Sequence, residues 1–321
     1  MKSSLLKLGI FLLTMLAFYV ALKNIKLDQQ VVESKTEFST KALIDVDNTS
    51  LFFIGSSRVQ RAIDPHLLES ELKNYSINNL GISGSTFLGN CVVADHILRL
   101  PGKKVIFIEL SPLKHDIPSG VFKFGEVEKF NVLSKVFQLT ENLGLSTQLM
   151  LVLDVLNTRM FSQISLKNDV KRIFRYKQSI EKDNQWIGYR PTNLQSRDKL
   201  IRFLRSSDVE DSCFSNYKLY IEMINDLDEL ASFSDGEIVF FLPLTYLKET
   251  EVRIATDLFA ILPERMKLRF SDRFIQSCSS EDYMADKNHF NKKGATNYSK
   301  GMIHQIQNYF QEKNKKENSN L

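Results

Sequence analysis

Two short stretches of the chain carry side chains that together can form and break acyl bonds. Gly55, Ser56 and Ser57 directly follow a run of large apolar residues, and Asp286 precedes His289 by three positions near the other end of the chain. A serine hydroxyl becomes a nucleophile when a histidine removes its proton and a carboxylate fixes the tautomer of that histidine. If residues 286–289 begin a helical turn, both side chains point the same way. The residue types therefore predict a serine nucleophile with a histidine base.

Both stretches also fit purely structural roles. Serine hydroxyls often satisfy backbone hydrogen bonds in turns and at helix caps, and Ser56 and Ser57 both suit that role. An Asp-x-x-His pair arises readily by chance, and Asp286 is a common residue type at a helix N-cap. The spacing alone leaves a structural and a catalytic interpretation open for each stretch.

Two further residues compete for the same chemical roles. Ser83 lies in the sequence Gly-Ile-Ser-Gly, which differs from the Gly-x-Ser-x-Gly motif of a nucleophile elbow. His115 follows a predicted strand and is an alternative general base, although its neighbours lack the pattern that flanks His289. The histidines at positions 66, 96 and 304 lie in helical contexts, and we interpret them as surface or packing residues.

The element that must position the two serines is the apolar run at residues 51–54, which fits a strand buried on both faces. Further runs of strand length occupy residues 75–82, 105–108, 238–242 and 268–270. Segments with helical spacing lie between them, at residues 66–73, 87–100 and 249–262. This alternation predicts βαβ units and a central parallel sheet of about five strands. In such a sheet, ligands bind beyond the carboxyl ends of the strands, where the serines lie.

The remaining chain divides into an anchor, a linker, one domain and a tail. We expect a signal anchor at residues 1–25, a linker at 26–49, an α/β domain at 50–312 and a disordered tail at 313–321. Within the domain, residues 121–235 are predicted to form a helical insertion, because they contain no clear buried strand. The last amphipathic helix is expected to end near residue 310, because the lysine-rich residues after it are polar.

The predicted anchor is the apolar run at residues 8–22, which follows Lys2 and Lys7. The run has the length of a signal-peptide core and approaches a full span when Leu5 and Leu6 are included. No small-x-small cleavage site follows it, which favours an uncleaved anchor with the domain outside the cytoplasm. A cleaved signal peptide and a buried core helix are the alternatives, and the lack of amphipathic periodicity disfavours the second.

The insertion holds the candidate residues for substrate binding. Lys and Arg outnumber Asp and Glu between residues 166 and 205, which is typical of a solvated face or of a surface for an anionic glycan or phospholipid head groups. Trp186, Tyr189 and Arg190 lie in a predicted loop there. Aromatic rings stack on sugars, so this loop is interpreted either as the lining of a substrate cleft or as a packing plug. Arg58, next to the serines, is a further candidate contact.

Composition limits the other classes of function. A formal net charge of +4 on 321 residues, without a zinc-finger or RNA-binding motif, argues against a nucleic-acid partner. The three cysteines, Cys91, Cys213 and Cys278, are widely spaced and form no Cys-x-x-Cys pair, so a cysteine-based metal site is not expected. No phosphate loop or dinucleotide fingerprint is present, and we expect no cofactor.

Three blocks of this sequence together resemble those of the SGNH/GDSL hydrolase superfamily. They are Gly-Ser-Ser at 55–57, Asn-Leu-Gly-Ile-Ser-Gly at 79–84, and Asp-x-x-His-Phe-Asn-x-x-Gly-Ala at 286–295. The resemblance covers roughly residues 50–112 and 236–310. It is closest to membrane-anchored extracytoplasmic members linked to acylation of cell-envelope polysaccharides. The resemblance implies a flavodoxin-like three-layer sandwich.

The resemblance also assigns roles to individual residues. It implies that Ser57 is the nucleophile, with Ser56 where the family usually has Asp, that His289 is the base, and that Asp286 orients it. The N–H groups of Ser57 and Gly84 match two donors of an oxyanion hole. The family usually takes a third donor from an asparagine after the third strand. That asparagine is missing here, where the chain reads Glu-Leu-Ser-Pro-Leu-Lys-His-Asp at 109–116.

These roles lead to an expected function and two alternatives. The resemblance implies a serine-dependent O-acyl esterase or acyltransferase, usually for acetyl groups, that acts on a cell-envelope or exported polysaccharide. Transfer would suit a membrane O-acyltransferase as partner, and the sequence does not separate transfer from hydrolysis. The first alternative is a non-catalytic glycan-binding or polysaccharide-assembly factor, motivated by the missing asparagine and the basic insertion. The second is an anchored α/β protein without a site.

Overall fold

The predicted strand at residues 51–54 forms the middle of strand β1 (Thr49–Gly55). The computed structural model describes residues 48–110, 189–195, 201–205 and 218–319. All four apolar side chains from Leu51 to Ile54 are fully buried. A strand covered by helices on both faces has no solvated side, which explains why the apolar run is continuous instead of alternating.

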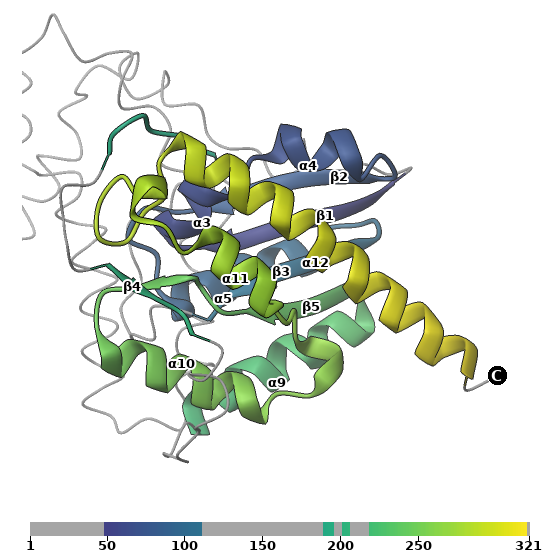
Figure 1. Ribbon diagram of the computed structural model, residues 1–321. Coiled ribbons are helices and arrows are strands. Elements are labelled where there is room, and N and C mark those ends of the chain that lie inside the picture. Colours follow the sequence, from purple (N-terminus) through teal and green to yellow (C-terminus); the bar gives the residue numbers. More distant parts are fainter. Residues whose placement is uncertain (1–47, 111–188, 196–200, 206–217, 320–321) are drawn as a thin grey trace, which may run out of the picture. The chain divides into compact units, whose positions relative to one another are not determined.

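Four parallel strands form the central sheet, in the order β2-β1-β3-β5 (Figure 1). Strands β2 (Tyr75–Gly81) and β3 (Lys104–Glu109) flank β1, and β5 (Gly236–Phe241) pairs with β3. The chain therefore leaves β1 toward one edge of the sheet and then returns past it toward the other. This reversal creates a topological switch point between β1 and β3, as in flavodoxin-like sheets, and ligand sites of such sheets lie beyond the carboxyl ends of these strands.

Helices cover both faces of the sheet (Figure 1). Helices α3 (Ser57–Ala62), α4 (Pro65–Glu71) and α12 (Lys292–Ser319) pack together on one face. Helices α5 (Phe87–Leu98) and α9 (Lys218–Phe233) pack together on the other. Right-handed crossovers require this alternation, because the β1–β2 and β2–β3 connections run in opposite directions across the sheet. The α/β class with a central parallel sheet is confirmed.

Shorter elements complete the described part of the chain. They are the antiparallel pair β4 (Arg202–Phe203) and β6 (Thr245–Tyr246), helices α10 (Glu249–Ile261) and α11 (Asp272–Cys278), and the 3-10 helices η4 (Glu264–Met266) and η5 (Glu281–Tyr283). Strand β4 belongs to the region predicted as a helical insertion without a clear buried strand, and its two residues are exposed and half-buried. These residues pair with β6, where Phe203 lies opposite Thr245 and Arg202 opposite Tyr246. The two strands are far apart in the sequence, so a local pattern could not indicate the pairing.

Two glycines allow α3 to pack closely against the carboxyl ends of β1 and β2. A Cβ atom at Gly55 would lie 2.3 Å from Cγ2 of Val59 and 2.7 Å from a carboxylate oxygen of Glu109. A Cβ atom at Gly81 would lie 2.3 Å from the backbone nitrogen of Gln60. Backbone atoms cannot yield as a flexible side chain can, so this end of the sheet needs the glycines for space.

The expected fifth strand at residues 268–270 is wrong for the part of the chain that the structure describes. Lys267 makes one isolated parallel bridge to Phe240, and the N–H of Leu268 donates to the carbonyl of Phe240 at 2.8 Å. The 3-10 helix η4 ends directly before this bridge, and α11 begins at Asp272. Too few residues remain between the two helices for a full strand to pair along β5.

The expected disordered tail at residues 313–321 is also wrong for residues 313–319, because α12 continues to Ser319. Glu, Gln and Lys, which dominate the end of this helix, lose little side-chain entropy in helices and have high helix propensity. Lys313 is fixed by a hydrogen-bonded ion pair of 2.6 Å with Glu237 at the start of β5. Polarity predicted disorder, whereas helix propensity and one tertiary contact extend the helix.

Several expectations lie outside the described residues. The predicted anchor at 1–25, nearly all of the linker at 26–49 and most of the insertion at 121–235 belong to this group, and so do Trp186, His115 and Asp116. In the ranges that the structure covers, no helix is both long enough and apolar enough to span a membrane.

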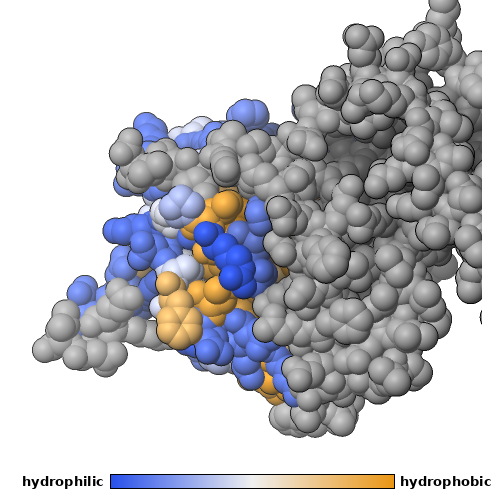
Figure 2. Space-filling model, turned by 180° about the vertical axis from the view of Figure 1, so that it is seen from behind, coloured by the Kyte–Doolittle hydropathy of each residue, from blue (hydrophilic) through white to orange (hydrophobic). Residues whose placement is uncertain are grey.

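The view from behind shows a surface on which hydrophilic residues surround a smaller apolar area (Figure 2). Across the described residues, the most exposed large apolar side chains are Leu194, Phe233 and Leu247, with exposed fractions of 67%, 82% and 59%. The three residues belong to three separate segments of the chain, so they do not form the apolar face of one helix.

Candidate active site

The two serines after β1 have different environments. Ser56 is the N-cap of α3, and its hydroxyl accepts the N–H of Arg58 at 3.2 Å. Ser57 is the first residue of the helix, at the carboxyl end of β1. Its Oγ lies 2.7 Å from Nε2 of His289. The structural interpretation therefore holds for Ser56, while the hydroxyl of Ser57 meets a base.

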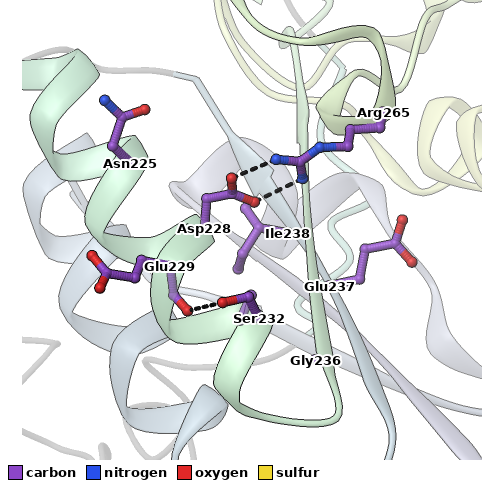
Figure 3. Close-up of a pocket in the computed structure, with 9 residues that line it drawn as sticks. Asn225, Asp228, Glu229, Ser232, Gly236, Glu237, Ile238 and Arg265 are labelled. Carbon is purple, nitrogen blue, oxygen red and sulfur yellow. Dashed lines mark hydrogen bonds and ion pairs between the residues drawn. The ribbon is translucent and has the colours of Figure 1, made fainter.

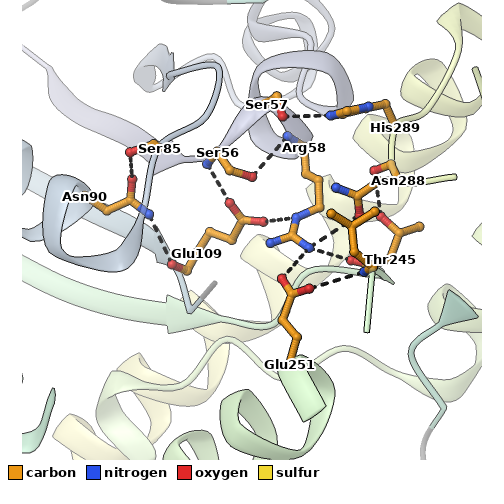
Figure 4. A network of polar contacts seen from close by, with 11 residues as sticks. Ser56, Ser57, Arg58, Ser85, Asn90, Glu109, Thr245, Glu251, Asn288 and His289 are labelled. Carbon is orange, nitrogen blue, oxygen red and sulfur yellow. Dashed lines mark hydrogen bonds and ion pairs between the residues drawn. The ribbon is translucent and has the colours of Figure 1, made fainter. Parts of the chain in front are cut away.

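His289 connects Ser57 to Asp286 (Figure 4 shows the Ser57–His289 contact). Nδ1 of His289 lies 2.8 Å from both carboxylate oxygens of Asp286. A proton on Nδ1 that is held by this carboxylate leaves Nε2 free to accept the hydroxyl proton of Ser57. The three residues thus form a Ser-His-Asp chain of hydrogen bonds, which is the arrangement that activates a serine nucleophile.

The loop from Asp286 to His289 is not the helical turn that we considered. Oδ1 of Asp286 accepts the backbone N–H groups of Asn288 and His289 at 2.9 and 3.0 Å. The carbonyl of His289 accepts the N–H of Ala285 at 2.8 Å. The Asp286 carboxylate therefore stabilises its own loop and also orients the imidazole. The structural role and the role expected for catalysis do not exclude each other.

The residues after His289 lock this loop to the start of α12. The Asn291 side chain donates to the carbonyl of Asp282 at 2.8 Å and accepts the N–H of Gly294 at 2.9 Å. A Cβ atom at Gly294 would lie 2.2 Å from the carbonyl oxygen of Tyr283. The Asn-x-x-Gly part of the sequence block thus has a packing role that holds the histidine loop.

Asp286 remains ionised well below neutral pH. Burial alone would raise its pKa, but the hydrogen bonds from His289 and the Asn288 N–H, with the charges of His289 and Arg61, lower it to about 2. Nη1 of Arg61 lies 3.4 Å from Oδ2 of Asp286. The carboxylate is therefore available to hold the imidazole throughout the neutral range.

Gly84 occupies a turn that directly follows β2. The N–H of Ser85 donates to the carbonyl of Ile82 at 2.9 Å, and Gly84 is the third residue of that turn with φ of 75°. Positive φ at this position is typical of a type II turn and requires glycine there. A Cβ atom at Gly84 would meet nothing within 4 Å, so conformation and not space selects the glycine.

Two backbone N–H groups remain available near the nucleophile. The N–H of Ser57 belongs to the first turn of α3 and has no intrahelical acceptor. Within the described residues, no acceptor is found for the N–H of Ser57 or of Gly84. They remain the predicted oxyanion donors. The segment after Leu110, where a third donor was expected from the resemblance, lies outside the described residues.

Ser83 serves the fold instead of competing with Ser57. Its hydroxyl donates to Oε1 of Gln60 in α3 at 2.7 Å. Asn79 of β2 also binds α3, through its side-chain amide and the carbonyls of Val59 and Ile63 at 3.0 and 2.6 Å. The Asn79–Gly84 block of the sequence therefore positions α3, and with it Ser57, on the sheet.

Arg58, which we predicted to contact substrate, is bound by groups of the protein itself. The side chain is 6% exposed and pairs with Glu109 at 2.7 Å and Glu251 at 3.0 Å. Burial would lower its pKa, but the charges of both carboxylates outweigh burial and raise it. Successive residues of a helix point about 100° apart, so Arg58 turns away from the side where Ser57 faces His289.

Two candidates from the aromatic loop can be placed. Tyr189 is half-buried against the core, and burial together with the charge and hydrogen bond of Asp64 raises its pKa to about 12. Arg190 is exposed, and its N–H donates to the carbonyl of Gln60 at 2.8 Å. Tyr189 thus packs against the core, and its predicted contact with substrate stays a prediction. The segment lies against α3 and the start of α12, where the carbonyl of Thr192 accepts the N–H of Lys292 at 2.6 Å.

A separate pocket lies at the other end of β5 and contains none of these residues (Figure 3). Its volume is about 450 Å³, and it lies between α9, the start of β5 and η4. Arg265 pairs there with both carboxylate oxygens of Asp228, at 2.7 and 2.5 Å. Arg265 and Asp228 thus bind each other, and we assign the pocket no role. In the described ranges, no group of three side chains suited to hold a metal ion is found.

The sequence reasoning missed several residues around the site. Glu109, Thr245 and Asn288 contact Arg58, and Arg61 contacts Asp286. Glu109 carried one detectable signal, because a carboxylate directly ends a strand of apolar residues and is fully buried. The other three have no local signal, since their roles depend on contacts across the fold.

Comparison of the chain with protein-family models, curated proteins and solved structures finds no match. The functional conclusion therefore depends on the geometry of Ser57, His289 and Asp286.

Proposed function

We propose that the chain is a serine-dependent O-acyl esterase or acyltransferase with Ser57 as nucleophile. The observation that carries this proposal is the continuous hydrogen-bond chain from Ser57 through His289 to Asp286, with distances of 2.7 and 2.8 Å. The site lies beyond the carboxyl end of β1, at the switch point of the sheet, where α/β proteins bind their ligands.

In the proposed reaction, Oγ of Ser57 attacks the carbonyl carbon of an ester while Nε2 of His289 takes the hydroxyl proton. The tetrahedral oxyanion accepts hydrogen bonds from the N–H groups of Ser57 and Gly84. The C–O bond to the leaving alcohol then breaks, and His289 returns the proton to that oxygen. An acyl-enzyme ester on Ser57 remains.

The second half of the reaction decides between hydrolysis and transfer. His289 removes a proton from water or from a sugar hydroxyl, whose oxygen attacks the acyl-enzyme, and Ser57 recovers its proton. We propose an O-acetylated cell-envelope or exported polysaccharide as the substrate class. The family resemblance and the predicted extracytoplasmic anchor support this substrate. A membrane O-acyltransferase is the proposed partner for the transfer reaction.

Fluorophosphonate labelling tests the nucleophile. The full chain is expected to form a covalent adduct that maps to Ser57 and that Ser57→Ala does not form. His289→Ala is expected to lose most of its activity on p-nitrophenyl acetate. If the wild type and Ser57→Ala remain equally unlabelled, the serine mechanism is lost, and the non-catalytic glycan-binding or assembly factor becomes the better proposal.

Transfer is measured by partition of the acyl-enzyme. With an acetyl donor and increasing concentrations of a soluble oligosaccharide, a transferase forms acetylated sugar at the expense of free acetate. An esterase releases the same amount of acetate at every acceptor concentration. Mass spectrometry of the sugar together with an acetate assay separates these two results.

A further inference from the structure

A buried carboxylate lies directly beneath the serine turn. Glu109, the last residue of β3, is fully buried. One of its carboxylate oxygens accepts the N–H of Ser56 at 2.6 Å, and the other accepts Nε–H of Arg58 at 2.7 Å (Figure 4). Ser57 lies between these two donors in the sequence. Glu109 therefore holds the backbone just before the nucleophile and the side chain just after it.

Arg58 extends this network toward the histidine loop. Its Nη1 donates to the carbonyl of Thr245 at 2.8 Å and to Oε1 of Glu251 at 3.0 Å, and lies 3.5 Å from Oδ1 of Asn288. Oγ1 of Thr245 in turn donates to the carbonyl of Asn288 at 2.9 Å. Asn288 directly precedes His289, so the network reaches from the residue before the nucleophile to the residue before the base.

Burying charged groups destabilises the fold unless each charge is paired and hydrogen-bonded. A buried ion pair gives little net stability compared with apolar residues of the same volume, because both charges lose their hydration. Its hydrogen bonds are directional, however, and they fix the groups that they join. Ser57 and His289 are 232 positions apart in the chain, so only tertiary contacts can set the distance between them.

The geometry points to Glu109 and Arg58 as a positioning pair that sets the contact between Ser57 and His289. Neither side chain contacts either reacting atom, so both act through the serine turn and the histidine loop. This inference rests on the proposed function for its kinetic consequence, but the hydrogen bond that it concerns is measurable without any substrate.

The test compares four forms of the full chain: wild type, Glu109→Gln, the double variant Glu109→Gln with Arg58→Met, and Lys104→Met. Glu109→Gln keeps the size of the side chain but leaves one acceptor oxygen for two donors. The double variant removes both members of the Arg58–Glu109 pair, so neither is left behind as an unpaired buried charge if the single variant folds poorly. Glu251, whose side chain is 16% exposed, loses its contact with Arg58 in this form. Lys104 is the matched control, because it is a buried charge at the amino end of the same strand, 3% exposed.

The first readout is the ¹⁵N NMR resonance of Nε2 of His289, assigned by its loss in His289→Asn. Ser57→Ala defines the shift that accompanies complete loss of the Ser57–His289 hydrogen bond. Glu109→Gln and the double variant are expected to move the resonance toward the Ser57→Ala value. Lys104→Met is expected to leave it at the wild-type value.

The second readout is the rate of acylation. Misplacing a reacting group by about 1 Å costs up to about 100-fold, so we expect kcat for p-nitrophenyl acetate and the fluorophosphonate labelling rate to fall about 10- to 100-fold in Glu109→Gln. KM is expected to stay unchanged, because neither residue faces the substrate. Lys104→Met is expected to keep the wild-type kcat.

The outcomes separate the two proposals. A wild-type resonance in both Glu109 variants overturns the positioning role, whatever the activity of the wild type. A shift of equal size in Lys104→Met also overturns it, because any lost buried charge would then have the same effect. A wild type that reacts with neither reagent, while Glu109→Gln still moves the resonance, overturns the proposed function and leaves the positioning role supported.

Discussion

At the scale of single residues, two neighbouring serines divide two roles. The hydroxyl of Ser56 accepts the N–H of Arg58 and caps α3, while Oγ of Ser57 lies 2.7 Å from Nε2 of His289. The helix that begins at Ser57 turns successive side chains by about 100°, so only one of the serines can face the histidine loop. The two serines therefore differ in the direction of their side chains and not in residue type.

Matched alanine variants test this division. Ser57→Ala is expected to abolish fluorophosphonate labelling with little change in stability. Ser56→Ala is expected to keep the labelling but to lose about 1 kcal/mol of stability, because the N-cap hydrogen bond is lost. Labelling kinetics and urea denaturation of both variants provide the measurement. A Ser56→Ala variant that is stable and unlabelled would instead assign the nucleophile to Ser56.

Asp286→Asn tests the orientation of His289. An amide can donate to Nδ1 of the imidazole and so favours the wrong tautomer for a base at Nε2. In the Ser-His-Asp mechanism this change lowers kcat by about 10⁴-fold. We expect a loss of that order on p-nitrophenyl acetate with a folded protein by circular dichroism. A loss of less than about tenfold would contradict the role of Asp286.

Asp286 also affects acid stability. Burial raises its pKa, but hydrogen bonds and nearby positive charges lower it from 3.8 to about 2. A carboxylate with a lowered folded-state pKa stabilises the fold above its unfolded value, and this contribution disappears as pH falls through the folded value. Between about pH 4 and about pH 2, wild type is therefore expected to lose more stability than Asp286→Asn. The side chain is 43% exposed, so the difference in urea denaturation is small.

At the scale of elements, the close contact of α3 with the strand ends sets the site. Gly81 faces the backbone of Gln60, whereas Gly84 faces open space but adopts φ of 75°. Both glycines are found in one block of sequence after β2. One is required by close packing and the other by conformation, which a sequence pattern cannot separate.

These two glycines are expected to respond differently to alanine. Gly81→Ala would place a methyl group 2.3 Å from a backbone nitrogen, so we expect a severe loss of stability or an insoluble protein. Gly84→Ala is expected to fold with a cost of about 1 to 2 kcal/mol and to lose acylation rate, because the turn that presents its N–H is strained. Urea denaturation and labelling rates distinguish the two. Full activity in Gly84→Ala would remove this residue from the oxyanion hole.

At the scale of the whole molecule, the last helix closes the site that the first strand begins. Ser299 of α12 is fully buried, and its hydroxyl donates to the carbonyl of Ala62 at 3.0 Å and accepts the N–H of Asp64 at 2.9 Å. This contact joins α12 to the end of α3. The histidine loop precedes α12 and the nucleophile begins α3, so the packing of these two helices brings distant parts of the chain together.

Ser299→Ala tests this connection without a change in the reacting groups. The partly buried N–H of Asp64 and the buried carbonyl of Ala62 would lose their partner, and an unsatisfied buried group costs about 1 to 3 kcal/mol. We expect a lower urea midpoint with an unchanged kcat for the folded protein. A lower kcat at unchanged stability would show instead that Ser299 acts on the site directly.

The degree to which sequence predicted the structure depends on how local each signal is. The predicted strands at 51–54 and 105–108 are confirmed as parts of β1 and β3, and residues 238–241 of the run at 238–242 are confirmed as part of β5. Apolar runs of strand length indicate burial on both faces. Helix α3 was not predicted, because its six residues follow a turn signal and lack a clear period. The fifth strand and the disordered tail were wrong, because neighbouring helices and a tertiary ion pair overrode the local pattern.

The sequence by itself determined the kind of sheet, the end of β1 at Gly55 and the presence of a serine, a histidine and a carboxylate suited to one reaction. Period, turn residues and residue type are local properties, and they were sufficient for these points. Only the tertiary structure decided that Ser57 and not Ser56 meets His289, and that Arg58 points inward to Glu109. Those choices depend on contacts between residues far apart in the chain, whose directions no local pattern contains.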